Sequence, residues 1–331
     1  STCTVDPAEN EENVRWILSQ LPFEPVDLTD RIGDALAETL LEDTRKKGYV
    51  QLLPGFYPGD GFFISVFRRK EEEDLKGGFK HMERDGRADL KSMTLPELTE
   101  YLKDLGEKPF RAKQLYQWMH VKLAASLDEM TNLSKEMRGI LKETAFYASL
   151  NPVDVRISQI DGTRKYLFEL EDGNVIESVL MRYKHGNSVC ISSQVGCRMG
   201  CRFCASTIGG LTRCLKPSEM LDQIYRIQAD TGERVANVVV MGTGEPMDNY
   251  DNLVRFVRIL TDENGLGISQ RNVTVSTCGI VPKMYDLAEE KLQITLALSL
   301  HAPNDEKRQE LMPIANKYSM DEVLEDRKSV V

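Results

Sequence analysis

Apolar and polar positions follow two different periods along this chain, and from about residue 189 the two periods alternate. Short apolar runs typical of strands occupy 165–170, 175–181, 189–194, 236–241, 272–277 and 293–299. Stretches with helical spacing occupy 217–230, 249–262, 282–290 and 319–326. Strands that alternate with helices predict parallel pairing with helical crossovers. We therefore expect an α/β fold, either a barrel or an open sheet.

A second region, 90–150, has helical spacing without strands between. Thr94 and Glu97 form a capping box, and Gly106 supplies the matching stop signal. The apolar residues of this first helix are Leu95, Leu98, Leu102 and Leu105. Further apolar positions predict a second helix through 110–119 and a third near 137–141. The region is predicted to be a small helical domain whose aromatic residues pack in its core.

The N-terminal part differs from both. It ends in a turn at 59–61 and an apolar strand at 62–67. The charged run 68–74 and the pair Gly77 and Gly78 follow, which is typical of a linker. The sequence therefore predicts five parts in this order: a fragment at 1–75, a linker at 76–89, a helical domain at 90–150, connecting strands at 151–188 and the α/β core at 189–331.

Composition indicates an ordinary globular protein. The chain has 331 residues, of which 41% are hydrophobic and 28% charged. No apolar run reaches the ~20 residues that span a membrane, and the first residues lack the basic and apolar parts of a signal peptide. We expect a cytoplasmic protein with no membrane partner, in which clustered cysteines indicate a metal site or catalysis.

The distribution of charge matters more than its sum. The net charge is −10, but residues 1–75 carry 8 Lys/Arg against 16 Asp/Glu. Segment 107–142 has 7 basic and 4 acidic residues, and segment 156–216 has 9 and 5. These two segments fit either a basic face for nucleic acid or ordinary solvated charges, and composition alone leaves both open.

Five of the seven cysteines lie between Cys190 and Cys214. Cys197, Cys201 and Cys204 have the spacing C-x3-C-x2-C directly after a predicted strand. Thiolates are the natural ligands of iron–sulfur clusters, and three ligands for four irons leave one iron open to a substrate. The alternatives are a zinc knuckle with Cys214 as its fourth ligand and a group of buried inert thiols.

A second motif, G-T-G-E-P at 242–246, follows the predicted strand 236–241. Glycine at the end of a strand lets a ligand approach the backbone. Glu245 offers a carboxylate for a ligand ammonium. The competing interpretations are a dinucleotide fingerprint, for which the third glycine is missing, and a plain turn.

Together these motifs resemble the radical S-adenosylmethionine (SAM) superfamily. The run V-C-I-S-S-Q-V-G-C at 189–197 resembles the adenine-C2 methyltransferases of large-subunit ribosomal RNA and transfer RNA. The runs S-T-C-G-I-V-P at 276–282, L-S-L-H-A-P at 298–303 and G-E-K-P-F-R-A-K-Q at 106–114 resemble the same family. The resemblance covers about 88–326 and implies an incomplete radical SAM (βα) barrel, similar to a partial TIM barrel.

The resemblance also implies roles for individual residues. Cys197, Cys201 and Cys204 would hold a [4Fe–4S] cluster. The residues that would bind SAM are Gly244, Glu245, Ser276, Ser299, Leu300 and His301. Glu177 would be the proton acceptor, and Cys190 the thiol that resolves a protein–RNA adduct through a transient disulfide.

The implied partners are large-subunit rRNA and tRNA, bound with help from the helical domain, and an electron donor such as flavodoxin or ferredoxin. The implied reaction adds a methyl group to C2 of adenine, a carbon that offers no nucleophile to a methyl cation donor. The alternatives are another radical enzyme that uses the same cluster and SAM, or a non-catalytic fused fragment.

Two departures from the family change the expectation for this chain. The family carries its methyl group on a cysteine near the C-terminus, and no cysteine follows Cys278. We therefore expect a C-terminally truncated chain that is disabled in methyl transfer. Separately, 1–13, 52–55 and 60–63 resemble the end of the rRNA cytosine-C5 methyltransferases, with Cys3 in the position of their nucleophile. We expect two adjacent coding regions read as one, with Met82 as the natural start of the second.

Overall fold

The computed structural model describes residues 14–15, 18, 23–25, 27–29, 44–47, 49–52, 62–65, 67–69, 83–84, 87–184 and 186–326. The chain divides into two compact units, Ser1–Lys80 and His81–Val331, and each is described here by itself. Every residue with a predicted role in the cluster, SAM or proton transfer belongs to the second unit. Cys3 lies outside the described residues.

The described part of the first unit contains two antiparallel pairs of short strands. Strand β1 (Phe23–Pro25) pairs with β4 (Phe67–Arg69), and β2 (Tyr49–Leu52) pairs with β3 (Phe62–Ser65). The apolar strand predicted at 62–67 is thus found as β3 and the start of β4. A short 3-10 helix, η1 (Arg45–Lys47), precedes β2.

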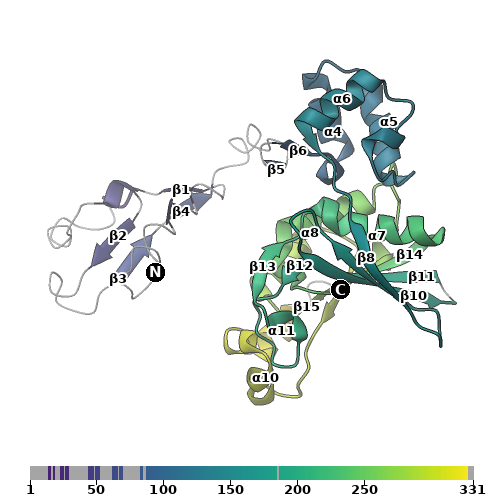
Figure 1. Cartoon of the computed structure of the whole chain (residues 1–331). Helices are drawn as coiled ribbons and strands as arrows, with labels where there is room; N and C mark the ends of the chain where they lie inside the picture. The colour runs from purple at the N-terminus through teal and green to yellow at the C-terminus, as the bar shows by residue number, and fades with distance from the viewer. Residues whose placement is uncertain are drawn as a thin grey trace. The chain divides into compact units, whose positions relative to one another are not determined.

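The second unit begins with a three-stranded sheet and three helices. Strand β6 (Arg87–Asp89) pairs with β5 (Glu83–Arg84) and, in parallel, with β7 (Ala145–Phe146). Between them run α4 (Leu95–Asp104), α5 (Pro109–His120) and α6 (Lys135–Thr144), as predicted. The capping box forms, since the Thr94 N–H donates to the Glu97 carboxylate over 2.8 Å. These helices gather at one end of the unit (Figure 1).

A seven-stranded sheet forms the centre of the second unit, in the order β16-β15-β14-β11-β10-β9-β8. Four strands are parallel to one another: β11 (Gly186–Ile191), β14 (Val235–Val240), β15 (Val273–Thr277) and β16 (Thr295–Leu298). Three are antiparallel extensions: β8 (Asn151–Ile157), β9 (Arg164–Glu169) and β10 (Val175–Tyr183). The sheet is open, so the α/β partial barrel that the sequence predicts is confirmed.

Helices cover one face of this sheet. The crossovers contain α7 (Pro217–Thr231), α8 (Tyr250–Leu260) and α9 (Val281–Glu289), followed by α10 (Asp305–Leu311) and α11 (Met320–Asp326) (Figure 1). Val189, Ile191, Val238 and Val240 face α7 and α8 and are at most 1% exposed. Residues that alternate with them, such as Cys190 and Val239, point to the other face and are half-buried. That second face is the inner face of the partial barrel.

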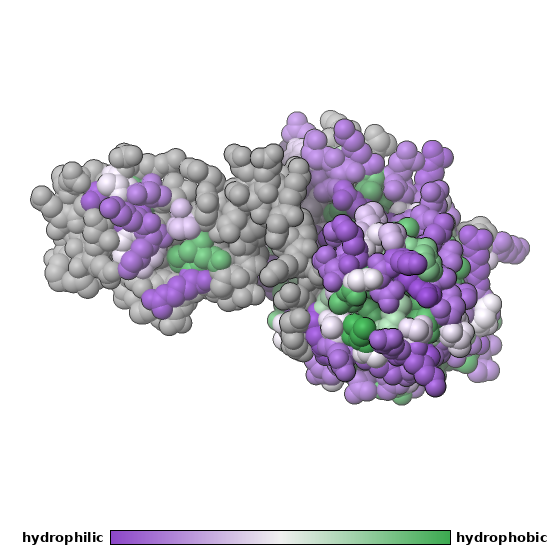
Figure 2. Space-filling view, turned by 90° about the horizontal axis from the view of Figure 1, so that it is seen from above, coloured by the Kyte–Doolittle hydropathy of each residue, from purple (hydrophilic) through white to green (hydrophobic). Residues whose placement is uncertain are grey.

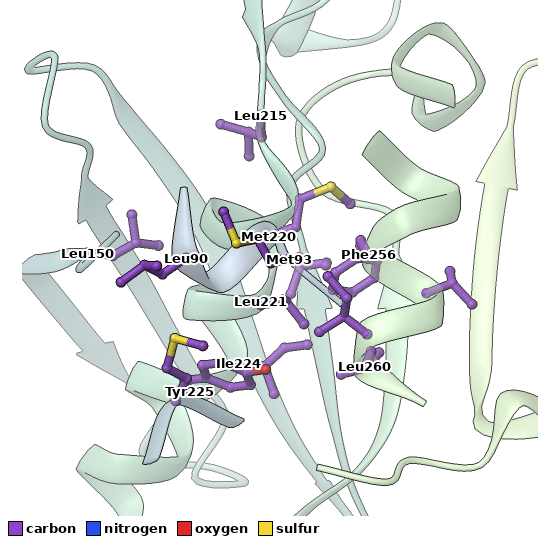
Figure 3. Close-up of a cluster of buried hydrophobic side chains, with 14 of the residues drawn as sticks. Leu90, Met93, Leu150, Leu215, Met220, Leu221, Ile224, Tyr225, Phe256 and Leu260 are labelled. Atoms are coloured by element: carbon purple, nitrogen blue, oxygen red, sulfur yellow. The ribbon is translucent and has the colours of Figure 1, made fainter. Parts of the chain in front are cut away.

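The core continues from the sheet into the first helices without a break. Figure 3 shows Leu90 and Met93, from the start of the helical region, packed with Met220, Leu221 and other residues of the α7–α8 layer. All are at most 2% exposed. The helical region and the sheet therefore share one hydrophobic core.

Several elements were absent from the sequence prediction, β8 and α10 among them. Strand β8 was not predicted, because its alternating Val153, Val155 and Ile157 are all more than a third exposed and carry no sign of a buried face. Helix α10 was not predicted either. In addition, β5 and β6 lie within the segment 76–89 that the sequence indicates as a linker.

The surface is mostly hydrophilic, with smaller apolar patches, on the face that Figure 2 shows. Ile160, in the turn between β8 and β9, is 98% exposed, and Ile208 is 87% exposed. Over the residues that the structure describes, none of the helices has the length and apolar character needed to cross a membrane.

Candidate active site

The predicted site residues converge at one edge of the sheet. The carboxyl ends of parallel strands meet at the same edge, and open α/β sheets bind their ligands there. The three cysteines follow β11, and Glu245 follows β14. Ser276 is the second-last residue of β15, and Ser299 follows β16. Four loops from four neighbouring strands thus supply the candidate site.

The cysteine loop is held by a tight backbone crossing. It begins after β12 (Gln194–Gly196), which pairs with β13 (Leu211–Cys214). The Cys197 N–H donates to the Gly210 carbonyl over 3.0 Å. Gly196 has φ +73°, and a Cβ there would lie 2.0 Å from the Gly210 oxygen. Only glycine therefore permits this crossing, which directs the chain into the loop.

The thiols of this loop are close enough to influence one another. Cys197 and Cys201 are buried, and Cys204 is half-buried. Burial is the main cause that raises the pKa of the Cys201 thiol, and the neighbouring Cys197 and Cys204 raise it further. Cys278 and Met312 complete the apolar wall beside Cys201. Three neighbouring thiols in an apolar setting are the donor set of an iron–sulfur cluster.

The zinc alternative does not fit the position of Cys214. Its thiol lies 3.4 Å from the amide nitrogen of Gln194 and 3.9 Å from the Asp248 carbonyl, away from the other thiols. Among the described residues, no three His, Cys, Asp or Glu side chains are placed to surround a single ion. A cubane presents a separate iron to each thiolate, so its ligands do not have to converge on one point.

Glu245 is 5% exposed and held in place by backbone groups. One carboxylate oxygen accepts from the Cys278 N–H over 2.8 Å, and the other accepts from the Met247 N–H over 3.1 Å. Burial raises the pKa of this carboxyl, against the lowering effect of these hydrogen bonds. A cationic ligand group beside this carboxylate would offset the cost of burying it.

Two further loops complete the edge. The Ser276 and Ser299 hydroxyls are 3.0 Å apart, and the Ser299 N–H donates to the Thr277 carbonyl over 2.9 Å. His301 has a positive φ of 57°, and its ring centre lies 4.6 Å from that of Phe203 in the cysteine loop. The run Ser299, Leu300 and His301 therefore lies next to the cysteine loop, as the prediction requires.

Glu177 and Cys190 lie on the inner face of the sheet. Cys190 is opposite Val179 on β10, and Glu177 is two residues farther along the same strand, so both side chains point to the same face. The Glu177 carboxylate is half exposed and lies 2.5 Å from the Lys165 ammonium. Burial raises the pKa of the Cys190 thiol. The two groups therefore share the inner face of the sheet.

The disulfide that the resemblance implies for Cys190 has no support in the structure. Six cysteines are described, and all six are free thiols: Cys190, Cys197, Cys201, Cys204, Cys214 and Cys278.

The sequence analysis missed three residues of this edge. Gln194, which is fully buried, donates to Asp248 over 3.0 Å and accepts from the Glu245 N–H over 2.8 Å. Asp248 also pairs with Arg198 of the cysteine loop. The available signal was a glutamine at the end of a predicted strand, three positions before Cys197.

Two family descriptions match the chain. "Ribosomal RNA large subunit methyltransferase N-terminal domain" matches residues 88–146, and "Radical SAM superfamily" matches residues 191–325. The first covers the three helices, and the second covers β14 to β16 together with the three cluster cysteines, Glu245 and the run from Ser299 to His301.

Curated relatives and a solved structure agree with these matches. Proteins named "Probable dual-specificity RNA methyltransferase RlmN" from Lachnospira eligens and Lachnoclostridium phytofermentans are 69% and 65% identical, over 72% and 71% of this chain and 68% and 66% of their own lengths. A crystal structure of a radical SAM methyltransferase from Sphaerobacter thermophilus is 42% identical, with a TM-score of 0.70, and the match covers 73% of this chain and 72% of that one.

The chain thus spans about two thirds of the length of the curated relatives it matches. Their identity is far above the level at which a shared fold is in doubt. The chain belongs to the RlmN family of radical SAM methyltransferases, which use a [4Fe–4S] cluster and S-adenosylmethionine.

Proposed function

We propose that this chain is an RNA methyltransferase that adds a methyl group to C2 of adenine in large-subunit rRNA and tRNA. The observation that carries the proposal is the convergence of three thiols, the buried Glu245 carboxylate and the Ser276–Ser299 pair at one sheet edge, next to an inner face that carries Glu177 and Cys190.

Each residue has a proposed part in holding the cofactors. Cys197, Cys201 and Cys204 hold the cluster, and Glu245 accepts the SAM ammonium. The Gly244 backbone lies beside the ligand, while Ser276 and the run from Ser299 to His301 line the other side. When bound, the cluster supplies the electron that cleaves SAM, and SAM supplies the methyl group.

Glu177 and Cys190 are proposed to act on the substrate. The Lys165 ammonium, 2.5 Å from the Glu177 carboxylate, holds that carboxylate in position to accept a proton from the ring carbon. The Cys190 thiol, with its raised pKa, stays protonated until the RNA adduct is resolved. The antiparallel strands β8 to β10 extend the inner face on which the adenine would lie.

The helices α4 to α6 are proposed to hold RNA, and a flavodoxin or ferredoxin is proposed to supply electrons. On α5, the Phe110 ring is 51% exposed, and the Arg111 guanidinium lies 4.9 Å from its centre. An exposed aromatic ring beside a cation suits stacking on an unpaired base together with a phosphate contact.

The test is anaerobic reconstitution followed by methyl transfer. The chain should take up about four irons and cleave SAM, and Cys201→Ala should abolish both. Tritium from methyl-labelled SAM should reach adenine C2 of unmodified rRNA, with the chain alone or with the chain joined to the C-terminal part of the Lachnospira eligens relative.

Glu177→Gln separates the chemistry from cofactor binding. This variant should keep iron content and SAM cleavage while methyl transfer falls about 100-fold or more, since a positioned proton acceptor contributes about that much. If the chain alone and the joined chain both cleave SAM but neither methylates adenine, the proposed substrate is contradicted and another radical reaction is favoured. Iron-free protein that binds zinc would contradict the site itself.

A further inference from the structure

The cysteine loop and the Glu245 loop are joined through one buried amide. Gln194 lies three residues before Cys197 and is fully buried. Its side-chain oxygen accepts from the Glu245 N–H over 2.8 Å, and its side-chain nitrogen donates to the Asp248 carboxylate over 3.0 Å. The Gln194 backbone N–H also donates to the Thr243 carbonyl over 3.1 Å. Gln194 thus contacts both ends of the segment that presents Glu245, one end through its backbone and the other through its side chain.

The contact returns to the cysteine loop through Asp248. The second oxygen of this carboxylate pairs with the Arg198 guanidinium, in the residue that follows Cys197. The Asp248 side chain is only 9% exposed and Gln194 is fully buried, so the hydrogen bond between these two acts in a poorly solvated setting, whereas the Arg198 side chain is 63% exposed. The path from Arg198 through Asp248 to Gln194 and Glu245 closes a ring between the two loops.

The packing at Gly244 shows how closely the two loops fit. Gly244 has φ +109°, and a Cβ at this position would lie 2.6 Å from the Gln194 Cβ. The Gln194 side chain therefore occupies the space that any side chain at position 244 would need. Its amide oxygen is placed to orient the Glu245 peptide through their hydrogen bond.

We propose that Gln194 and Asp248 are positioning residues that set the placement of Glu245, and so of bound SAM, relative to the cluster cysteines. The inference rests on the proposed role of Glu245 in binding SAM. The amide oxygen orients Glu245, and the amide nitrogen transmits the position of the cysteine loop through Asp248 and Arg198. Neither residue touches SAM in this assignment.

The test reverses the polarity of the Gln194–Asp248 hydrogen bond. Gln194→Glu keeps the oxygen that accepts from Glu245 but places a second carboxylate against Asp248. It should keep about four irons per chain and raise the SAM dissociation constant about tenfold or more, as expected when a buried hydrogen bond to a charge becomes a repulsion. Adding Asp248→Asn restores a donor, and the double variant should return to within about threefold of the starting affinity.

Gln228→Glu is the matched control. The Gln228 side-chain oxygen accepts from the Val235 N–H over 3.0 Å, away from both loops, so the same change should leave SAM affinity unaltered. If Gln194→Glu is insoluble, Gln194→Leu removes the hydrogen bonds to Glu245, Asp248 and the Cys214 thiol without adding charge and should weaken SAM binding with the cluster retained.

The outcomes separate this inference from the proposed function. Isothermal titration of SAM and iron content are measured on each reconstituted protein, together with the change that SAM causes in the electron paramagnetic resonance spectrum of the reduced cluster. Unchanged affinity in Gln194→Glu, or a double variant as weak as the single one, would overturn the inference. A starting protein that binds neither iron nor SAM would instead overturn the proposed function.

Discussion

The Lys91 ammonium lies 2.6 Å from the Asp222 carboxylate, and neither side chain is exposed to solvent. Lys91 belongs to η2 (Leu90–Ser92), at the start of the helical region, and Asp222 belongs to α7 on the sheet. The Lys91 ammonium also donates to the Ala148 carbonyl over 2.6 Å, and the other Asp222 oxygen accepts from the Leu150 N–H over 2.7 Å. The pair joins the RNA-methyltransferase N-terminal region to the radical SAM core.

Lys91→Met should lower the free energy of unfolding by about 3 kcal/mol, because it removes the nearer cation of the buried Asp222 carboxylate and leaves only the Arg226 guanidinium, 3.5 Å away. Urea denaturation measures the loss. Lys103→Met breaks the exposed pair with Glu100 and should have little effect. Equal losses in the two variants would show that burial of the Lys91 pair has no special importance.

His120 should make the protein less stable in mild acid. The ring is fully buried, and burial, followed by the Lys91 charge, lowers its pKa to about 3. The unfolded chain binds this proton near pH 6.5, so between about 6.5 and 3 the unfolded state holds more protons than the native state. The free energy of unfolding should therefore fall by up to ~1.4 kcal/mol for each pH unit below 6.5.

His120→Gln removes this titration. Urea denaturation at pH 8, 6.5 and 5 should give a shallower loss of stability in the variant, by about 2 kcal/mol between pH 6.5 and 5. At pH 8 the His120 ring is neutral in the folded and in the unfolded protein. The difference between the two proteins at this pH therefore measures the loss of the hydrogen bond between the His120 ring and the Tyr225 hydroxyl. Parallel curves for the two proteins would contradict the prediction.

Gly244→Ala should abolish SAM binding without loss of the cluster. The new Cβ would clash with Gln194 and would require a left-handed φ, whereas the three cysteines are unaffected. Gly139→Ala, in the middle of α6, meets nothing within 4 Å and should raise stability by about 0.5–1 kcal/mol. Tight SAM binding by Gly244→Ala would show that the two loops can separate at no cost.

Removal of Ser1–Lys80 should leave iron content and SAM affinity unchanged. The second unit contains every candidate cofactor residue and its own core. The measurement compares reconstituted full-length protein with a variant that begins at His81. Loss of iron uptake in the shorter protein would show that the first unit takes part in forming the site.

Sequence periodicity predicted the parallel strands to within about three residues, because buried strands in such sheets are continuous apolar runs. It failed at β8, an edge strand with apolar side chains exposed, and at α10, which is seven residues long. Helix α10 depends on tertiary contacts, chiefly the buried Arg308 side chain, which donates to the Cys278 carbonyl over 2.6 Å. The hydrophobic pattern along the sequence cannot predict a contact between residues 30 positions apart.

The candidate site likewise contains some residues that the sequence predicted and others that it did not. Cys197, Cys201 and Cys204 were predictable because their spacing is local, and the structure brings their predicted neighbours to the same edge. Gln194 and Asp248 were not, because their hydrogen bond joins residues 54 positions apart. A single buried amide side chain has no periodic signature in the sequence. Its role depends on the Glu245 backbone N–H that lies opposite it in the folded chain.

The parallel pairing of β11 with β14 also determines when the site can form. Cys190 lies opposite Val239, so the whole cysteine segment and α7 form a loop that closes only when β14 has been made. During synthesis, Cys197, Cys201 and Cys204 leave the ribosome well before the strand that completes their surroundings. Until that closure these thiols are ordinary reactive cysteines, open to oxidants and stray metals. Delivery of iron must therefore keep pace with folding, and slow folding would leave the chain with damaged thiols rather than an empty site.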